Sequence, residues 1–288
     1  MPAPLTDLVL NWGLPALRDL PWRRTRDPWA VLVSELMLQQ TQVARVLPRW
    51  PEFLERFPTV AVCASAPVGD VVRMWDGLGY NRRAVNLHRA ALAIVERHDG
   101  CFPRDRDALL ALPGIGPYTA RAVLVFAFER DEAVVDTNIA RVLARVNGRS
   151  MRPGEVQEMA DELVPPGEGW AWNQVLMDLG ATVCTKRAAR CEICPLADGP
   201  CAWQSSGRAQ PDPAIGSAGV STGQSRFDGS DRQGRGRLVT ALRQGAVDDE
   251  RLARVMGWPS DEARARRVAD TLVRDGLAVR LAGGLELP

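Results

Sequence analysis

The stretch from Leu112 to Arg145 constrains the fold of this chain more than any other part of its sequence. It opens with Gly114 and Gly116 in a turn, directly before an apolar run that favours a helix. Glycine lets a backbone amide approach a ligand without a Cβ in the way, and a helix N-terminus supplies unpaired N–H donors. The turn is therefore suited to binding one phosphate of a nucleic-acid backbone. A tight turn without a ligand is the alternative.

The second half of this stretch places a single acid ahead of an amphipathic helix. Asp136 precedes Ile139, Val142, Leu143 and Val146, which follow one another at helical spacing. The acid therefore lies at the predicted start of a helix.

Glu35 lies in an almost wholly apolar window. Asp27 and Pro28 form a good helix start, and between Trp29 and Leu38 only Ser34 and Glu35 are polar. We expect a carboxyl group in such surroundings to lose solvent, which raises its pKa and suits a general acid. A buried Glu paired with an Arg is the alternative.

Tyr80 follows a glycine-flanked turn in a region of short helices. Between residues 45 and 97 we expect these helices to break at prolines 48, 51, 58 and 67. Tyr80 could stack on a base, while Arg82 and Arg83 behind it could meet phosphates. A core tyrosine at a helix start is the alternative.

Four cysteines lie close together, in the pattern C-x6-C-x2-C-x6-C at Cys184, Cys191, Cys194 and Cys201. We expect a cytoplasmic protein without a membrane segment, because no signal core or long apolar run occurs. Disulfides are rare in that compartment, so the pattern indicates a metal site. Zinc and an iron–sulfur cluster both compete for it; the single close CxxC pair favours a [4Fe–4S] cluster.

The overall charge carries no nucleic-acid signal. The chain has 288 residues and a net charge of +1, so DNA binding has to come from local sites. Lys186 is the only lysine, and it lies in the cysteine-rich loop.

Together these motifs resemble those of the helix-hairpin-helix DNA glycosylase superfamily, which includes endonuclease III and the MutY adenine glycosylases. The resemblance covers roughly residues 5–204 and rests on the strings LPGIGPYTA, VDTN, SELMLQQTQV, GLGY and LPWR. It implies a mostly α fold: a six-helix barrel over about 23–132, and an iron–sulfur subdomain from 1–22 and 133–204.

The resemblance also assigns roles to individual residues. Glu35 becomes the catalytic acid and Asp136 the anion that stabilises the cationic sugar. Gln40 would wedge into the duplex, and Tyr80 would insert beside the mispair. Binding to substrate or DNA is implied for Trp22, Arg23, Gln39, Gln40, Thr41, Tyr80, Gly114, Ile115, Gly116, Tyr118, Asn138 and Gln174.

Two departures from the family pattern matter. The family spaces its cluster ligands C-x6-C-x2-C-x5-C, whereas this chain has one extra residue before Cys201. Endonuclease III carries its lysine nucleophile at the position of Tyr118, so we expect no strong strand-cleaving activity here.

The tail differs from that of the longer family members. Residues 205–235 are rich in Gly, Ser, Pro and Arg and predict a flexible linker. Residues 236–288 predict a winged-helix-like module, with helices at 238–242, 251–256 and 262–274 and a hairpin at 277–287. Many family members carry instead a NUDIX-like domain that recognises 8-oxoguanine. This module could equally dock on the protein or read DNA.

The resemblance implies a monomeric, monofunctional glycosylase that removes adenine opposite 8-oxoguanine or guanine in double-stranded DNA. One alternative is a thymine or uracil mismatch glycosylase of the same fold. The others are a non-catalytic iron–sulfur protein that binds lesions and, least favoured, a zinc-stapled winged-helix regulator.

Overall fold

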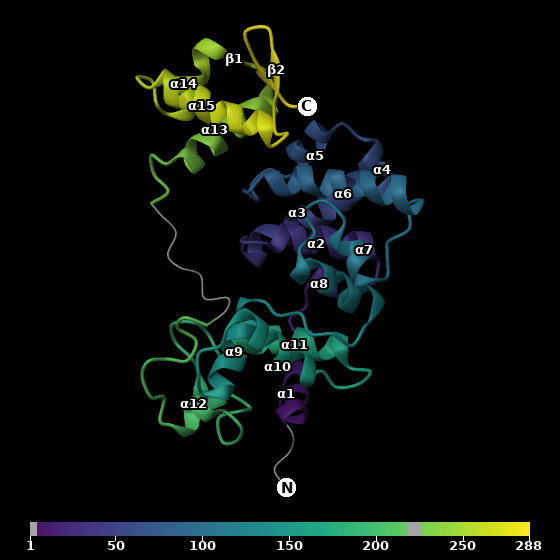
Figure 1. The fold of residues 1–288 in the computed structure, drawn as a ribbon, viewed down its shortest axis with the longest axis vertical. Helices are drawn as coiled ribbons and strands as arrows, with labels where there is room; N and C mark the ends of the chain where they lie inside the picture. Colours follow the sequence, from purple (N-terminus) through teal and green to yellow (C-terminus); the bar gives the residue numbers. More distant parts are fainter. Residues whose placement is uncertain (1–4, 218–225) are drawn as a thin grey trace. The chain divides into compact units, whose positions relative to one another are not determined.

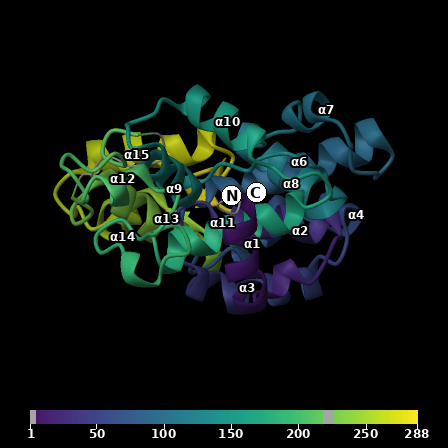
Figure 2. The ribbon, with the colours of Figure 1, turned by 90° about the horizontal axis from the view of Figure 1, so that it is seen from below.

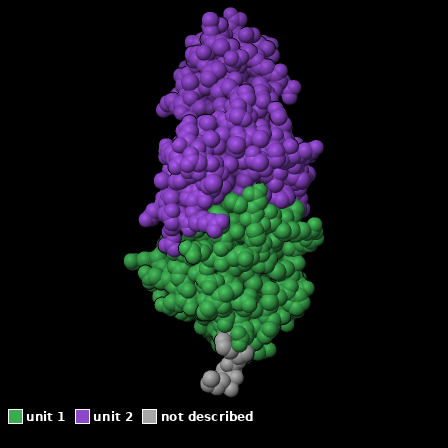
Figure 3. Space-filling view, turned by 90° about the vertical axis from the view of Figure 1, so that its right-hand side faces the viewer, with its two compact units in different colours: residues 1–28, 116–222 green, residues 29–115, 223–288 purple. Residues whose placement is uncertain are grey.

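The computed structural model describes residues 5–217 and 226–288 (Figure 1). The chain folds into two compact units. Unit 1 comprises residues 1–28 and 116–222, and unit 2 comprises residues 29–115 and 223–288 (Figure 3). The predicted mostly helical class is confirmed. None of the helices in the described ranges is long and apolar enough to cross a bilayer.

Unit 1 is helical. Its helices are α1 (Leu5–Gly13), α8 (Pro117–Phe128), α9 (Thr137–Asn147), α10 (Pro153–Glu162), α11 (Gly169–Thr182) and α12 (Ala202–Ser205), with 3-10 turns η1 (Leu14–Ala16), η2 (Pro21–Arg23) and η3 (Cys191–Ile193).

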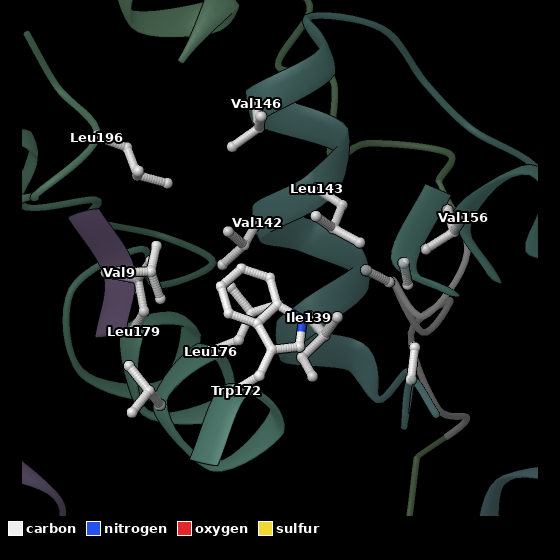
Figure 4. Close-up of a cluster of buried hydrophobic side chains, with 14 of the residues drawn as sticks. Val9, Ile139, Val142, Leu143, Val146, Val156, Trp172, Leu176, Leu179 and Leu196 are labelled. Atoms are coloured by element: carbon white, nitrogen blue, oxygen red, sulfur yellow. The ribbon is translucent and has the colours of Figure 1, made fainter. Parts of the chain in front are cut away.

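The core of unit 1 forms around Trp172 of α11 (Figure 4). Val9 of α1 and Ile139 of α9 belong to the same buried cluster. Helices α1 and α11 lie side by side in both ribbon views (Figures 1 and 2) and pack closely. A Cβ added to Gly13 would lie 2.0 Å from Cγ1 of Val175, so only glycine permits this approach.

Helix α11 continues past Gly180 and ends at Thr182, although glycine commonly follows the end of a helix. A Cβ on Gly180 would lie 2.6 Å from Cβ of Asn138. The glycine therefore brings α11 against the start of α9 and does not terminate the helix.

Unit 2 combines helices with a small sheet. Its elements are α2 (Pro28–Leu38), α3 (Val43–Arg56), α4 (Val60–Ser65), α5 (Val68–Met74), α6 (Arg82–His98), α7 (Arg106–Leu110), α13 (Asp231–Gln244), β1 (Val247–Asp248), η4 (Asp249–Arg251), α14 (Leu252–Met256), α15 (Glu262–Arg274), β2 (Val279–Leu281) and β3 (Gly284–Glu286).

Helix α2 is buried on all sides, as its apolar composition predicts. The indole of Trp29 donates to the carbonyl oxygen of Phe57 at 2.8 Å, and that of Trp50 donates to Ala30 at 3.0 Å. These hydrogen bonds satisfy the polar ends of two large core side chains.

Helix α3 continues through Pro48 and Pro51, so the breaks predicted at these two residues are wrong. Each proline removes one hydrogen bond to the carbonyl four residues earlier. Both prolines are exposed, as are Ala44 and Leu47, whose carbonyls lose those bonds. Water can therefore take the place of the missing donors.

The C-terminal module contains three helices and a hairpin in the predicted order, but α13 is longer than the helix predicted at 238–242, and a third strand, β1, joins the hairpin. Its strands form an antiparallel sheet in the order β1-β3-β2, with Arg280 opposite Leu285. Gly283 has a φ of 89° in the tight turn between β2 and β3, which favours glycine there.

The C-terminal module packs on α5 within unit 2. Arg243 of α13 bonds the carbonyl oxygen of Val72 at 3.1 Å and the side-chain oxygen of Asn81 at 2.9 Å, and it pairs with Asp76. The amide of Gly69 donates to the carbonyl oxygen of Pro288 at 2.7 Å. Of the two predicted possibilities, these contacts support docking on the protein.

The flexible linker predicted over residues 205–235 is wrong at both ends. Residues 212–217 pack within unit 1, where Asp212 pairs with the buried Arg145 at 2.7 Å and Ser217 is buried. At the other end, α13 already begins at Asp231. The prediction for residues 218–225 lies outside the described residues.

Candidate functional site

Glu35 lies within the buried helix α2, and the residue is 6% exposed. Its neighbour Ser34 bonds the carbonyl oxygen of Val31 within the same helix at 2.8 Å. The burial predicted for Glu35 is therefore confirmed, while its catalytic role stays a prediction.

The turn after α2 exposes Gln40. This residue has a φ of 54°, a left-handed conformation that costs free energy in a residue with a Cβ. Thr41, next in the chain, donates from its hydroxyl to the carbonyl oxygen of Leu78 at 3.2 Å. The turn is thus tied to the loop that carries Tyr80.

Tyr80 lies at the end of a second strained turn. Gly77, Gly79 and Tyr80 have φ values of 78°, 70° and 45°, and the Tyr80 side chain is 45% exposed. Two consecutive left-handed residues hold this aromatic ring at the surface, as expected of a residue that meets a partner.

Arg83 is buried, so the phosphate contact predicted for it is wrong. It is 8% exposed, and its guanidinium bonds the backbone of both turns. Burial lowers the pKa of Arg83 to about 10, which still leaves the side chain charged at neutral pH. Arg82 remains exposed, 3.6 Å from Asp275. The helix pattern around Arg83 gives no sign of its buried partners.

The glycine turn before α8 has the predicted local conformation. Gly114 has a φ of 77°, and α8 begins at Pro117 with Gly116 as its N-cap. The amide of Ile115 donates to the carbonyl oxygen of Leu112 at 3.2 Å, so the turn itself uses it. Tyr118 lies half-buried in the first turn of α8.

Asp136 is the N-cap of α9, as the sequence predicts. Its Oδ1 accepts from the amides of Asn138 at 2.8 Å and Ile139 at 2.7 Å, and its Oδ2 accepts from Nδ2 of Asn138 at 2.7 Å. Burial raises the pKa of Asp136, whereas these hydrogen bonds and the nearby Arg141 lower it. The net shift is upward, and the carboxylate is fixed in one orientation.

Arg141 orients the amide of Asn138. Its Nη2 donates to Oδ1 of Asn138 at 2.8 Å, which turns Nδ2 of that residue toward Asp136. The same guanidinium bonds the carbonyl oxygens of Gly180 at 2.6 Å and Cys184 at 2.7 Å. Sequence reasoning missed Arg141, although a cation within an otherwise apolar helix face could have marked it.

The four predicted ligands, Cys184, Cys191, Cys194 and Cys201, line one small cavity together with Arg145 and Trp203. Burial raises the pKa of Cys184 and Cys201, and that of Cys194 to about 11. Such thiols stay protonated at neutral pH unless a bound cation stabilises the thiolates.

No group of three or more His, Cys, Asp or Glu side chains in residues 5–217 and 226–288 is placed to hold a single metal ion. The thiols nevertheless converge on one cavity. A cubane has an iron at each of four corners, so it needs its four thiolates further apart than one ion does. The donor set fits such a cluster.

Three further predicted residues are buried in unit 1. Trp22 and Gln174 are both buried. Arg23 makes a two-point ion pair with Asp178, at 2.9 Å and 2.7 Å. This pair joins η2 to α11, and contact of these three residues with a substrate stays a prediction.

Residues 33–166 match the family model of the HhH-GPD superfamily of base excision DNA repair proteins. The adenine DNA glycosylase of Mycolicibacterium smegmatis is 44% identical over 96% of this chain and 93% of its own length. The thymine/uracil-DNA glycosylase of Pyrobaculum aerophilum is 39% identical over 68% of this chain and 90% of its own length.

Solved structures give the same fold. A thermostable thymine-DNA glycosylase superposes with a TM-score of 0.65 and 30% identity, covering 70% of this chain and 95% of its own. An endonuclease III in complex with DNA superposes with a TM-score of 0.62 at 24% identity, covering 70% of this chain and 94% of its own.

Proposed function

The chain belongs to the HhH-GPD superfamily of base excision DNA repair proteins and, within it, to the adenine DNA glycosylases, and we propose that it excises adenine opposite 8-oxoguanine or guanine. Excision leaves an abasic site, which other enzymes of the repair sequence must process. A double-stranded DNA that contains such a mispair is the proposed substrate.

Cleavage of an N-glycosidic bond needs two groups. An acid assists departure of the base, and an anion stabilises the cationic sugar that remains. We assign the first role to Glu35, which would protonate adenine at N7, and the second to Asp136. Water then completes hydrolysis. The two acids belong to different compact units, and their meeting across an extruded nucleotide stays a prediction.

The observation that carries this proposal is the fixed carboxylate of Asp136. Three hydrogen bonds from Asn138 and Ile139 hold both of its oxygens at a helix N-terminus. A carboxylate held in this way needs no reorganisation when positive charge develops on a sugar beside it. Two features of the sequence support hydrolysis without strand cleavage: Tyr118 takes the place of a lysine, and the single lysine, Lys186, lies in the cysteine-rich loop.

The base must leave the duplex before it can react. We propose that Gln40 and Tyr80 fill or prop the gap, with Gln39 and Thr41 beside them. The left-handed turns that carry Gln40 and Tyr80 support this role. The amides of Gly114 and Gly116 would hold one phosphate, with Ile115 between them, whose own amide donates within the turn. Asn138, Trp22, Arg23 and Gln174 are proposed to shape the pocket.

We propose that Cys184, Cys191, Cys194 and Cys201 hold a [4Fe–4S] cluster, as the resemblance to endonuclease III implies. The cavity that these thiols line supports the assignment. When bound, the cluster would tie the loop after α11 into one rigid piece, and no step of base excision passes through it. Lys186 and Arg187 are exposed on this loop, where they could meet phosphates.

The alternative is a thymine or uracil mismatch glycosylase, because the enzyme from Pyrobaculum aerophilum is also similar. That similarity spans 68% of this chain, whereas the mycobacterial adenine enzyme matches 96% of it, the C-terminal module included. The longer match favours adenine. A monomeric state and a cytoplasmic location on nucleoid DNA stay predictions, as does the non-catalytic alternative.

The test compares labelled duplexes that hold adenine opposite 8-oxoguanine, adenine opposite guanine, or thymine opposite guanine. Each reaction is divided into samples with and without alkali. Alkali-dependent breaks at adenine support the proposal. Breaks at thymine support the alternative, spontaneous nicking indicates a lyase, and intact strands despite binding indicate a lesion-binding protein.

A further inference from the structure

Two exposed turns of unit 2 share an unusual backbone. Gln40 follows α2 with a φ of 54°, and Tyr80 precedes α6 with a φ of 45°. Left-handed conformations in residues with a Cβ persist only where surrounding structure holds them. The two turns are far apart in the sequence, so a residue that contacts both is needed to hold them together.

Arg83 contacts the turn that contains Gln40. Its Nη1 donates to the carbonyl oxygens of Leu36 at 2.6 Å, Met37 at 2.9 Å and Gln39 at 2.6 Å. Its Nη2 donates to the hydroxyl of Thr41 at 3.0 Å. These bonds fix the end of α2 and the residues on both sides of Gln40.

The same guanidinium contacts the second turn. Its Nη2 donates to the carbonyl oxygens of Leu78 at 3.1 Å and Gly79 at 3.0 Å, and its Nε reaches that of Tyr80 at 3.4 Å. Its Cζ lies 5.6 Å from the ring centre of Tyr80 and 5.5 Å from that of Trp75. Arg83 therefore contacts each residue from Leu78 to Tyr80.

Only arginine can make this set of contacts. Its guanidinium presents five N–H donors in a rigid planar fork, whereas the ammonium of lysine has three donors on a flexible stem. In the described part of the chain, the partners of Arg83 are backbone carbonyls, one hydroxyl and two aromatic rings. The buried charge is thus balanced by the dipoles of the two turns themselves.

We infer that Arg83 is a positioning residue that locks the Gln39–Thr41 turn and the Leu78–Tyr80 turn into one rigid element. This inference deepens the proposed function and rests on it for its consequence: Gln40 and Tyr80 then enter the duplex as a pair. Loss of the arginine fork frees each turn to relax by itself. Excision of the mispaired base then slows, while general attraction to DNA is kept.

Fluorine NMR tests the rigid element without any catalysis. The chain has two tyrosines, Tyr80 and Tyr118, so 3-fluorotyrosine labelling gives two signals that a Tyr80→Phe variant assigns. We expect Arg83→Lys to shift and broaden the Tyr80 signal and to leave the Tyr118 signal in place. Arg97→Lys, an equal change at an exposed position of the same helix, is the control and should move neither. An unmoved Tyr80 signal in folded Arg83→Lys protein overturns the inference.

Thr41→Val provides a second variant if Arg83→Lys fails to fold. It removes the hydroxyl that accepts from Arg83 and donates to Leu78, but it changes no charge. Since Thr41 lies in the other turn, a shifted Tyr80 signal supports coupling of the turns. An unchanged signal in this variant contradicts it.

Single-turnover excision tests the functional consequence. Arg83→Lys should slow excision by about ten- to a hundredfold, the effect of one or two lost charge-assisted hydrogen bonds. The affinity of Arg83→Lys for undamaged duplex should equal that of Arg97→Lys.

A double-mutant cycle tests whether the two turns act together. The effects of Gln40→Ala and Tyr80→Ala on the logarithm of the excision rate should be non-additive in the wild-type background and additive in the Arg83→Lys background. Additivity in both backgrounds contradicts the inference. If the wild-type protein releases no base, the proposed function fails. The fluorine NMR result then decides by itself whether Arg83 couples the two turns.

Discussion

Nδ2 of Asn138 lies 2.7 Å from Oδ2 of Asp136, and Arg141 holds that amide in place from its other side. The carboxylate at the start of α9 thus has a donor of fixed orientation. Burial raises the pKa of Asp136, and the backbone amides of Ile139 and Asn138, the Asn138 side chain and Arg141 limit this rise. We therefore expect the contact between Asn138 and Asp136 to affect the pH dependence of base excision.

We expect Asn138→Ala to move the acid limb of excision activity to higher pH. The substitution removes a hydrogen bond that favours the ionised carboxylate, so the pKa of Asp136 rises further and the active anion is lost sooner on acidification. The measurement is the single-turnover rate from pH 4 to pH 8, with Arg97→Lys as the control. An acid limb identical to that of the wild type contradicts this role of Asn138.

The same raised pKa has a consequence for stability. Folding favours the protonated form of Asp136, so its contribution to stability is fully present below the ordinary aspartate pKa and is lost as the pH rises through the folded-state value. Asp136 therefore does not stabilise the fold at neutral pH through ionisation.

Cys201→Ser tests whether Cys201 is a cluster ligand despite the extra residue that precedes it in this chain. We expect purified wild-type protein to be brown, with about four irons and four sulfides per chain. The variant should lose the visible absorbance that makes the protein brown, because a hydroxyl is a poor ligand for iron. The loop after α11 should then lose its order. Cys101→Ser, at an exposed cysteine outside the motif, is the control. Colourless wild-type protein that contains zinc contradicts the assignment.

Tyr118→Lys should add strand-cleaving activity. The resemblance to endonuclease III implies that a lysine here attacks the sugar and forms a Schiff base, whereas the single native lysine, Lys186, lies in the cysteine-rich loop. We expect borohydride to trap the variant on DNA, but neither the wild type nor Tyr118→Phe. Trapping of the wild-type protein shows that a nucleophilic amine is already present.

Arg243→Met should loosen the C-terminal module. The guanidinium bonds Val72 and Asn81 and pairs with Asp76, and loss of such contacts costs about 1–3 kcal/mol. The amide of Gly69, which donates to Pro288, reports docking through its hydrogen exchange, which should quicken. Arg254→Met, at an exposed position of the module, is the control. Equal exchange in both variants means that Arg243 does not hold the module.

Local features of the fold follow from the sequence because neighbours in the chain determine them. The start of α2 at Pro28, the N-cap at Asp136 and the hairpin turn at Gly283 depend on residues within a few positions. The buried Glu35 follows from the apolar run around it.

Features that depend on distant partners do not follow from the sequence. Arg83 follows Arg82 behind an aromatic turn, where the sequence predicts a residue that binds phosphate. Arg83 is buried only because two turns that are distant in the sequence both contact it. Asp212 belongs to a segment with linker composition, yet the buried Arg145 holds it on unit 1. Gly180 is of a residue type that commonly follows a helix end, yet it lies within α11, where the absence of a Cβ leaves room for Asn138.

Glu35→Gln tests the central claim most directly. The variant keeps the shape of the side chain but cannot donate an acidic proton, so we predict that it binds duplex with adenine opposite 8-oxoguanine as the wild type does. Its single-turnover release of adenine should fall by more than about a hundredfold. The measurement is alkali-dependent strand breakage beside a binding isotherm on the same duplex. Release at the wild-type rate would contradict the assignment of Glu35 as the acid.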